Sequence, residues 1–125
     1  MTGPELRAML TGVVRGALPD EWTCYAWPPA APPSWPAAIL SAGDPYREPD
    51  TYCSDRYRLG VDLLNPTSQG EPGFDAVDLA APFVVDAITA EQGFGYEATR
   101  TVARNVGGID AYGLTIGLAI NGVTP

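Results

Sequence analysis

Residues 56–64 read Arg-Tyr-Arg-Leu-Gly-Val-Asp-Leu-Leu, and this stretch decides the fold class. Tyr57, Leu59, Val61 and Leu63 alternate with charged or small residues. Successive side chains of a β-strand point to opposite faces, so the alternation predicts a strand with one buried and one polar face. Such a strand needs an apolar cover on one side only.

Upstream of this strand, the sequence predicts one helix and two strands. Apolar residues recur at the i, i+3, i+4 spacing of a helical face until Pro19 ends the helix. Residues 22–27 are rich in aromatic residues and residues 37–42 are apolar, which predicts two strands. Between them, residues 28–36 contain five prolines, which exclude a helix or central strand and favour an extended loop. Residues 43–50 carry the Gly, Asp and Pro residues of an ordered loop. The helical stripe consists of Leu6, Met9, Leu10, Val13, Val14 and Ala17.

Downstream, residues 65–73 predict a loop and residues 75–90 a second helix. Pro82 lies inside this helix, so we expect a kink or a late start there. The residues predicted on one apolar side of the helix are Leu79, Ala80, Phe83, Val84, Ala87 and Ile88.

The remainder predicts a hairpin, with arms over residues 96–106 and 111–120 and a turn over residues 107–110. The order α-β-β-β-α-β-β is typical of an α+β domain, with two helices on one face of a mostly antiparallel sheet of four to five strands. The 125 residues show no repeat or boundary, which predicts a single domain over residues 1–125. Small residues alternate with Ile and Leu in the last strand, so we expect another backbone or subunit to pack closely there.

Composition excludes several classes of function. The chain has no His, which excludes a Ser–His–Asp triad, a Cys–His pair and an imidazole metal site. Its two cysteines, Cys24 and Cys53, are too few for a structural zinc site, and we expect reduced core residues rather than reactive thiols. Fifteen acidic residues against seven basic ones argue against a surface that grips nucleic acid. No apolar run reaches the length of a membrane span.

No motif indicates catalysis or a cofactor. Asp75 and Asp78 are i, i+3 neighbours, but acidic residues are favoured near a helix N-terminus without any catalytic role. The Gly-Phe-Gly at residues 93–95 is too short for a phosphate-binding fingerprint. We therefore expect a protein that is not an enzyme and has no cofactor and no metal.

Four residues suit a protein interface. Trp27 and Trp35 flank the proline run, and they either anchor an interface or cap the core of the domain itself. Arg56 and Arg58 project from one face of the central strand, where they meet acidic partners or DNA phosphates, or simply form a solvated sheet face.

The whole layout is similar to a known family. An amphipathic helix is followed by a proline-rich crossing, then Ala-Ala-Ile-Leu at residues 37–40 and Gly-Asp-Pro-Tyr-Arg-Glu-Pro at residues 43–49. The alternating strand, a loop, a helix and a C-terminal hairpin complete it. This order resembles the small neck proteins of long-tailed (siphovirus-type) phages of actinobacteria, most closely the tail terminator proteins. All seven basic residues are Arg, a sign of GC-rich coding that agrees with this host group.

The resemblance implies a structural protein of the virion, assembled in the host cytoplasm. Tail terminators form a hexameric ring that caps the tail tube, stops its polymerisation and meets the head-side connector. The implied partners are further copies of the chain, the major tail tube protein, and a connector or stopper protein. DNA passes through the lumen without sequence-specific binding, and an acidic lumen would let it slide.

Two alternatives remain beside the terminator. One is a head–tail stopper or other neck connector, and the other is a small bacterial domain that binds a ligand or a peptide. In a ring, the stiff loops are expected to supply contacts between subunits. The candidate interface residues are Trp27, Trp35, Tyr46, Arg47, Tyr52, Arg56 and Arg58.

Overall fold

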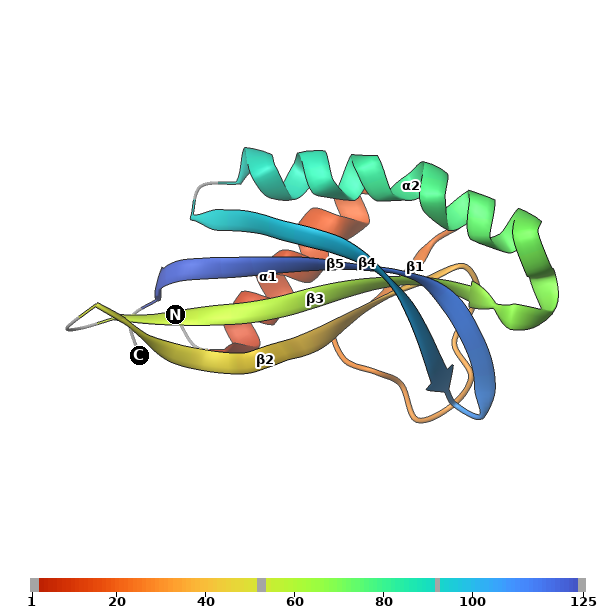
Figure 1. The fold of residues 1–125 in the computed structure, drawn as a ribbon, viewed down its shortest axis with the longest axis horizontal. Helices are drawn as coiled ribbons and strands as arrows, with labels where there is room; N and C mark the ends of the chain where they lie inside the picture. Colours follow the sequence, from red (N-terminus) through yellow and green to blue (C-terminus); the bar gives the residue numbers. More distant parts are fainter. Residues whose placement is uncertain (1–2, 52–53, 92, 124–125) are drawn as a thin grey trace.

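The computed structural model describes residues 3–51, 54–91 and 93–123. Two helices lie on one side of a five-stranded sheet of order β1-β2-β3-β5-β4 (Figure 1). All neighbouring strands are antiparallel except β1 and β2, which confirms the predicted α+β fold. The elements are α1 (Gly3–Ala17), β1 (Thr23–Tyr25), β2 (Ala37–Thr51), β3 (Ser54–Pro66), a 3₁₀ turn (Thr67–Gln69), α2 (Gly70–Ala90), β4 (Phe94–Val106) and β5 (Ile109–Val123).

The main core fills the space between the helices and the sheet. The predicted burial of Tyr57, Leu59, Val61 and Leu63 of β3 in this core is confirmed. The opposite face is partly exposed at Arg56 and Arg58 but buried from Gly60 to Leu64. Each fully buried aliphatic side chain contributes about 1.5–3 kcal/mol of transfer free energy. The largest fully buried residues of the main core are Leu6, Leu10, Val14, Leu40, Val61, Leu63, Val77, Ile88, Ile116 and Leu118.

The other face of the sheet is covered at one end only. A second, smaller buried cluster lies there, and Tyr25 and Trp35 pack against it. The proline-rich loop approaches the β4–β5 turn so closely that a Cβ on Gly107 would lie 2.2 Å from the Ala31 carbonyl carbon. We call the rest of this side the open face. The second cluster consists of Ala37, Ile39, Leu64, Val102, Val106 and Ala111.

Helix α2 begins earlier than predicted. The expected loop over residues 65–73 is wrong, because β3 continues to Pro66 and α2 begins at Gly70. Pro72 falls in the first turn of the helix, where the missing N–H would have no intrahelical partner. The helix then continues through Pro82 to Ala90, so the expected late start at Pro82 is also wrong.

The buried side of α2 differs from the predicted one. Leu79 and Phe83 were expected on the apolar side, but their side chains are 75% and 61% exposed. Ala80 and Ala81 are buried at the middle of the helix, while the larger Leu79 and Phe83 point outward. The buried side consists of Gly73, Val77, Ala80, Ala81, Val84 and Ile88.

Strand β2 is longer than the predicted strand over residues 37–42. The expected loop over residues 43–50 is wrong, because β2 pairs with β3 again from Arg47 onward. Residues 43–46 form a bulge opposite Arg58, and a Cβ on Gly43 would lie 2.9 Å from the Arg58 carbonyl oxygen. The prolines in this segment remain compatible with a strand because β1 covers only the first residues of β2.

The C-terminal hairpin is tighter than predicted. Val106 pairs with Ile109, so the turn contains only Gly107 and Gly108 rather than residues 107–110. Both glycines have positive φ, 59° and 87°, as a two-residue turn between twisted strands requires.

Candidate functional site

The predicted interface residues do not form one patch. Two of them lie on the open face of the sheet, three join a cluster beside α1, and one packs at the proline-rich loop. The seventh, Tyr52, lies outside the described residues.

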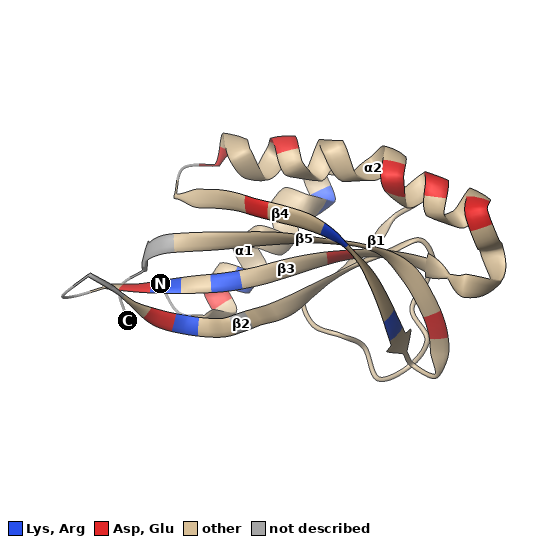
Figure 2. Ribbon diagram, viewed as in Figure 1, with Lys and Arg blue, Asp and Glu red and all other residues tan. Residues whose placement is uncertain are grey.

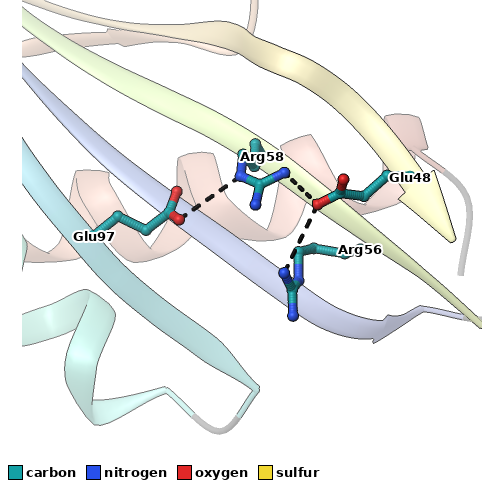
Figure 3. A network of polar contacts seen from close by, with 4 residues as sticks. All are labelled: Glu48, Arg56, Arg58 and Glu97. Carbon is teal, nitrogen blue, oxygen red and sulfur yellow. Dashed lines mark hydrogen bonds and ion pairs between the residues drawn. The ribbon is translucent and has the colours of Figure 1, made fainter. Parts of the chain in front are cut away.

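Arg58 is the centre of a charged network on the open face (Figure 3). Its Nη1 donates a hydrogen bond to Glu48 Oε1, and its Nε lies 3.7 Å from Glu97 Oε2. Arg56 Nη1 lies 3.7 Å from the same Glu48 oxygen. These side chains are partly exposed, so each ion pair is worth at most about 1 kcal/mol. The network joins β2, β3 and β4 and holds the guanidinium groups of Arg56 and Arg58 in place on the open face.

The small residues of β5 have a role in this network. Strand β5 lies between β3 and β4, so the contact from Arg58 to Glu97 has to cross it. Ala119 of β5 pairs with Arg58, and Gly117 pairs with Ala98, next to Glu97. Small side chains there leave room for the two long ones to meet. The close packing by another backbone that we expected is found at Gly113, where a Cβ would lie 1.9 Å from the Leu63 carbonyl oxygen, but not at Gly117.

A shallow cavity of about 330 Å³ lies beside this network. Two arginines line it: Arg58, and Arg100, which is exposed and forms no ion pair with any described residue. Guanidinium groups form paired hydrogen bonds with carboxylates, so this cavity suits an acidic side chain of a partner. Glu97, Ala98, Thr115 and Gly117 form the rest of its lining.

A buried acid completes the open face. Asp62 is only 3% exposed, and its carboxylate accepts hydrogen bonds from Arg104 Nε at 3.2 Å and from Ser41 Oγ at 3.5 Å. A buried carboxylate without partners is strongly unfavourable, so Arg104 compensates the burial of Asp62. The charged network, this pair and Arg100 at the cavity together place four of the seven arginines on the open face. We call Arg56, Arg58, Arg100 and Arg104 the arginine face.

Removing the partner of the buried acid is expected to destabilise the fold. Arg104→Ala leaves Asp62 buried beside only a hydroxyl, so we expect the free energy of unfolding to fall by about 1–3 kcal/mol. Arg47→Ala is the matched control, because Arg47 is exposed where it pairs with Asp55, and its loss should cost clearly less stability. Urea denaturation of both variants measures the difference. Equal losses would show that burial of Asp62 does not set the strength of its pair.

The three candidates beside α1 belong to one cluster of arginines and aromatic rings. Arg7 Nη1 donates to Tyr46 Oη at 2.7 Å, and its guanidinium carbon lies 5.4 Å from the centre of the Trp27 ring. The rings of Tyr46 and Tyr57 meet edge to face, 5.3 Å apart. Arg47 lies 5.8 Å over the Tyr57 ring. Although Arg7 stacks on it, Trp27 remains 59% exposed, which is unusual for so large an aromatic residue.

The two tryptophans that flank the proline run have different surroundings. Trp35 is half-buried and packs against the second cluster of the domain's own core. For Trp35, the structure therefore matches the second of the two interpretations, a cap on the core. Trp27 faces solvent, so the first interpretation, an interface anchor, stays a prediction for this residue.

Helix α2 presents a surface that sequence reasoning missed. Its exposed side carries Glu71, Asp75, Asp78 and Asp86, and the helix contains no Lys or Arg (Figure 2). The exposed Leu79 and Phe83 lie among these acids. We call these four acids with Leu79 and Phe83 the acidic ridge. The sequence did not indicate this surface, because the helical spacing of Leu79 and Phe83 is that of residues facing a core.

Cys24 is a free thiol that packs half-buried against the main core. Burial raises the pKa of this thiol, and the nearby Arg15 charge lowers it by less. Because only the thiolate reacts, a raised pKa makes the thiol less reactive.

This raised pKa predicts slow alkylation of Cys24. In a Cys53→Ser variant near pH 8, iodoacetamide should modify Cys24 more slowly than it modifies a free cysteine in a peptide. The rate should rise toward that of the peptide only above the peptide's own thiol pKa, because the thiolate fraction of Cys24 increases at higher pH. Mass spectrometry of timed samples measures the rate. A rate equal to that of the peptide at pH 8 would contradict the raised pKa.

The described residues contain no group of three or more His, Cys, Asp or Glu side chains placed to hold a metal ion. Neither helix in the described part of the chain is long and apolar enough to span a membrane. Comparison of the sequence with protein-family models and with curated proteins gave no match.

Proposed function

We propose that this protein is a phage tail terminator. Six copies form a ring that caps the tail tube, stops its polymerisation and joins it to the head-side connector while DNA passes through. Its role is structural rather than enzymatic. Its place is the virion neck after assembly in the host cytoplasm. Its partners are its own copies, the major tail tube protein and a connector or stopper protein.

One observation carries this proposal: the two sides of the subunit are unlike and complementary. The acidic ridge lies on the outside of α2, on the helix side of the sheet, whereas the arginine face lies on the other side. A closed ring with more than two subunits is built from heterologous contacts, in which one patch meets a different patch on the next copy. Three of the four arginines already pair with acids of the same chain, so the arginine face carries only a small positive excess, centred on Arg100. The acidic ridge lies on a helix without Lys or Arg, so opposite charge still favours this head-to-tail contact and disfavours the meeting of two ridges.

The net charge supports the passage of DNA. The chain carries a formal charge of −8, and pairing the acidic ridge with the arginine face inside the ring still leaves an acidic surplus. Affinity for DNA comes largely from neutralised phosphates, so an acidic lumen repels the DNA backbone and keeps it mobile. A ring at the end of the tail needs this property because the genome has to leave through it.

Assembly without the protein tests the terminator role against the stopper alternative. When the protein is omitted, tail tubes should grow past their normal length, because nothing ends their polymerisation. Tails of normal length beside heads that leak DNA would contradict the terminator and support a head–tail stopper. Electron microscopy of the two preparations gives the tail lengths directly.

A further inference from the structure

A second cavity, of about 270 Å³, opens where β3 passes into α2. Its walls are mainly apolar: the rings of Phe74 and Tyr112 lie 5.6 Å apart, and Pro66 adds to them. Glu71 belongs to the same lining. Sites for whole cofactors usually measure about 300–1,000 Å³, so this cavity is suited to a single large side chain.

One wall of the cavity holds an unsatisfied hydrogen-bond acceptor. Asn65 is 4% exposed, and its Nδ2 donates to the Gly73 carbonyl oxygen at 3.0 Å. A carbonyl oxygen only accepts, so this bond fixes the orientation of the amide and leaves Oδ1 as the free atom. Within the part of the chain that the structure describes, Asn65 Oδ1 is the only buried side-chain polar atom without a partner. Buried polar atoms almost always have partners, so a donor is expected to reach this one.

The cavity therefore selects for a flat apolar group that carries a donor. Phe74 and Tyr112 provide ring surfaces for stacking, and Asn65 Oδ1 accepts one hydrogen bond. A tryptophan side chain meets both requirements, because its indole N–H is a donor and cannot accept. Phenylalanine and aliphatic side chains would leave the Asn65 oxygen unsatisfied.

The chain itself presents such a group on another part of its surface. Trp27 is 59% exposed, and its indole N–H has no acceptor among the described residues. The Arg7 guanidinium stacks on this ring and places a positive charge beside it, while Glu71 places a negative charge at the cavity. Trp27, which we call the knob, and the cavity, which we call the socket, are thus complementary in hydrogen bonding and charge.

We propose that Trp27 of one subunit inserts into the cavity formed by Asn65, Phe74 and Tyr112 of a second copy of this chain. This contact rests on the proposed ring, because a knob and a socket on different parts of one subunit make a heterologous interface. Trp27 then acts as an interface hot spot. Asn65 Oδ1 has almost no accessible surface in the single subunit, so the cavity wall has to open slightly before the indole N–H donates to it. Glu71, the member of the acidic ridge that lines the cavity, meets Arg7 across this contact and fixes its register, while the other acids of the ridge meet the arginine face.

The test compares variants of Trp27 and of the cavity in the full-length chain. Trp27→Ala removes the inserted side chain. Thr67→Trp places a large side chain in the cavity, because Thr67 lines it and is exposed. Both should raise the concentration for half-assembly at least about thirtyfold. Trp27→Phe keeps an aromatic ring without the donor and should have a smaller effect. Tyr96→Ala is the control for Trp27→Ala, because it removes another exposed aromatic ring. Ser68→Trp is the control for Thr67→Trp, because Ser68 is exposed and adjacent to Thr67 but does not line the cavity.

Native mass spectrometry measures assembly, and circular dichroism with thermal melting shows that each variant folds. Loss of assembly in Trp27→Ala and Thr67→Trp with normal assembly in both controls supports the contact. A hexamer that both variants leave intact overturns the contact but retains the ring. A smaller oligomer that both variants dissociate retains the contact and overturns the ring. A wild-type protein that stays monomeric overturns both proposals.

Discussion

Gly113→Ala is expected to disrupt the centre of the sheet, because a Cβ at this position would lie 1.9 Å from the Leu63 carbonyl oxygen. No side-chain movement relieves this overlap, since the atom belongs to the backbone of β3. Gly113 pairs with Leu64, so the strands can separate only by breaking the β3–β5 ladder. We expect a loss of at least about 3 kcal/mol in the free energy of unfolding, a large fraction of the stability of a small domain.

Gly117→Ala is the matched control on the same strand and the same face. The nearest atom to its Cβ would be the Ala98 carbonyl oxygen at 3.5 Å, which is an ordinary contact. Alanine also restricts the unfolded chain, so this variant should be as stable as the wild type or gain up to about 1 kcal/mol. Chemical denaturation of the two variants measures the contrast. Similar stabilities would show that β3 and β5 approach less closely at Gly113 than described.

Reversing charge on the acidic ridge is expected to prevent ring assembly without affecting the fold. Asp75 and Asp78 are exposed on α2 and form no ion pair with the described residues, so changing both to Arg removes no contact within the subunit. In the ring, the new arginines would face the arginine face of the neighbouring copy. Like charges across an interface cost several kcal/mol, so we expect the concentration for half-assembly to rise at least about a hundredfold.

The control for this variant changes net charge by the same amount elsewhere. Asp20→Arg with Asp110→Arg alters two exposed acids that lie outside α2. Native mass spectrometry at one ionic strength compares the two double variants, and thermal melting verifies that both fold. If both assemble equally well or equally poorly, overall charge rather than the acidic ridge governs association, and the proposed pairing of faces is wrong.

The parts of the fold that follow from a simple period were predictable from the sequence. The alternation in β3 and β5 indicated their core-facing residues because helices cover one side of the sheet along its length, whereas the other side is covered at one end only. The predictions that rested on prolines were wrong at three positions. Pro72 resembles a helix breaker but fits the first turn of α2, and Pro45 and Pro49 resemble a loop but occupy a strand whose outer side is largely unpaired.

The candidate site was less predictable, because its contacts join residues far apart in the sequence. Arg58 was identified from its position on a polar strand face, but its contact with Glu97 depends on β5 lying between β3 and β4. Helical spacing alone predicts Leu79 and Phe83 in the core, because it does not show which side of an almost uniformly apolar helix faces the sheet. The free oxygen of Asn65 has no sequence signal, because it depends on the direction of a single amide.

The most direct test of the ring is the molar mass of the intact protein across a concentration series, measured by light scattering and native mass spectrometry. We predict a species of six subunits, six times the chain mass of 13.2 kDa, that dissociates as salt weakens the contact between opposite charges. A mass of one chain, 13.2 kDa, at the highest soluble concentration and low salt would contradict the account.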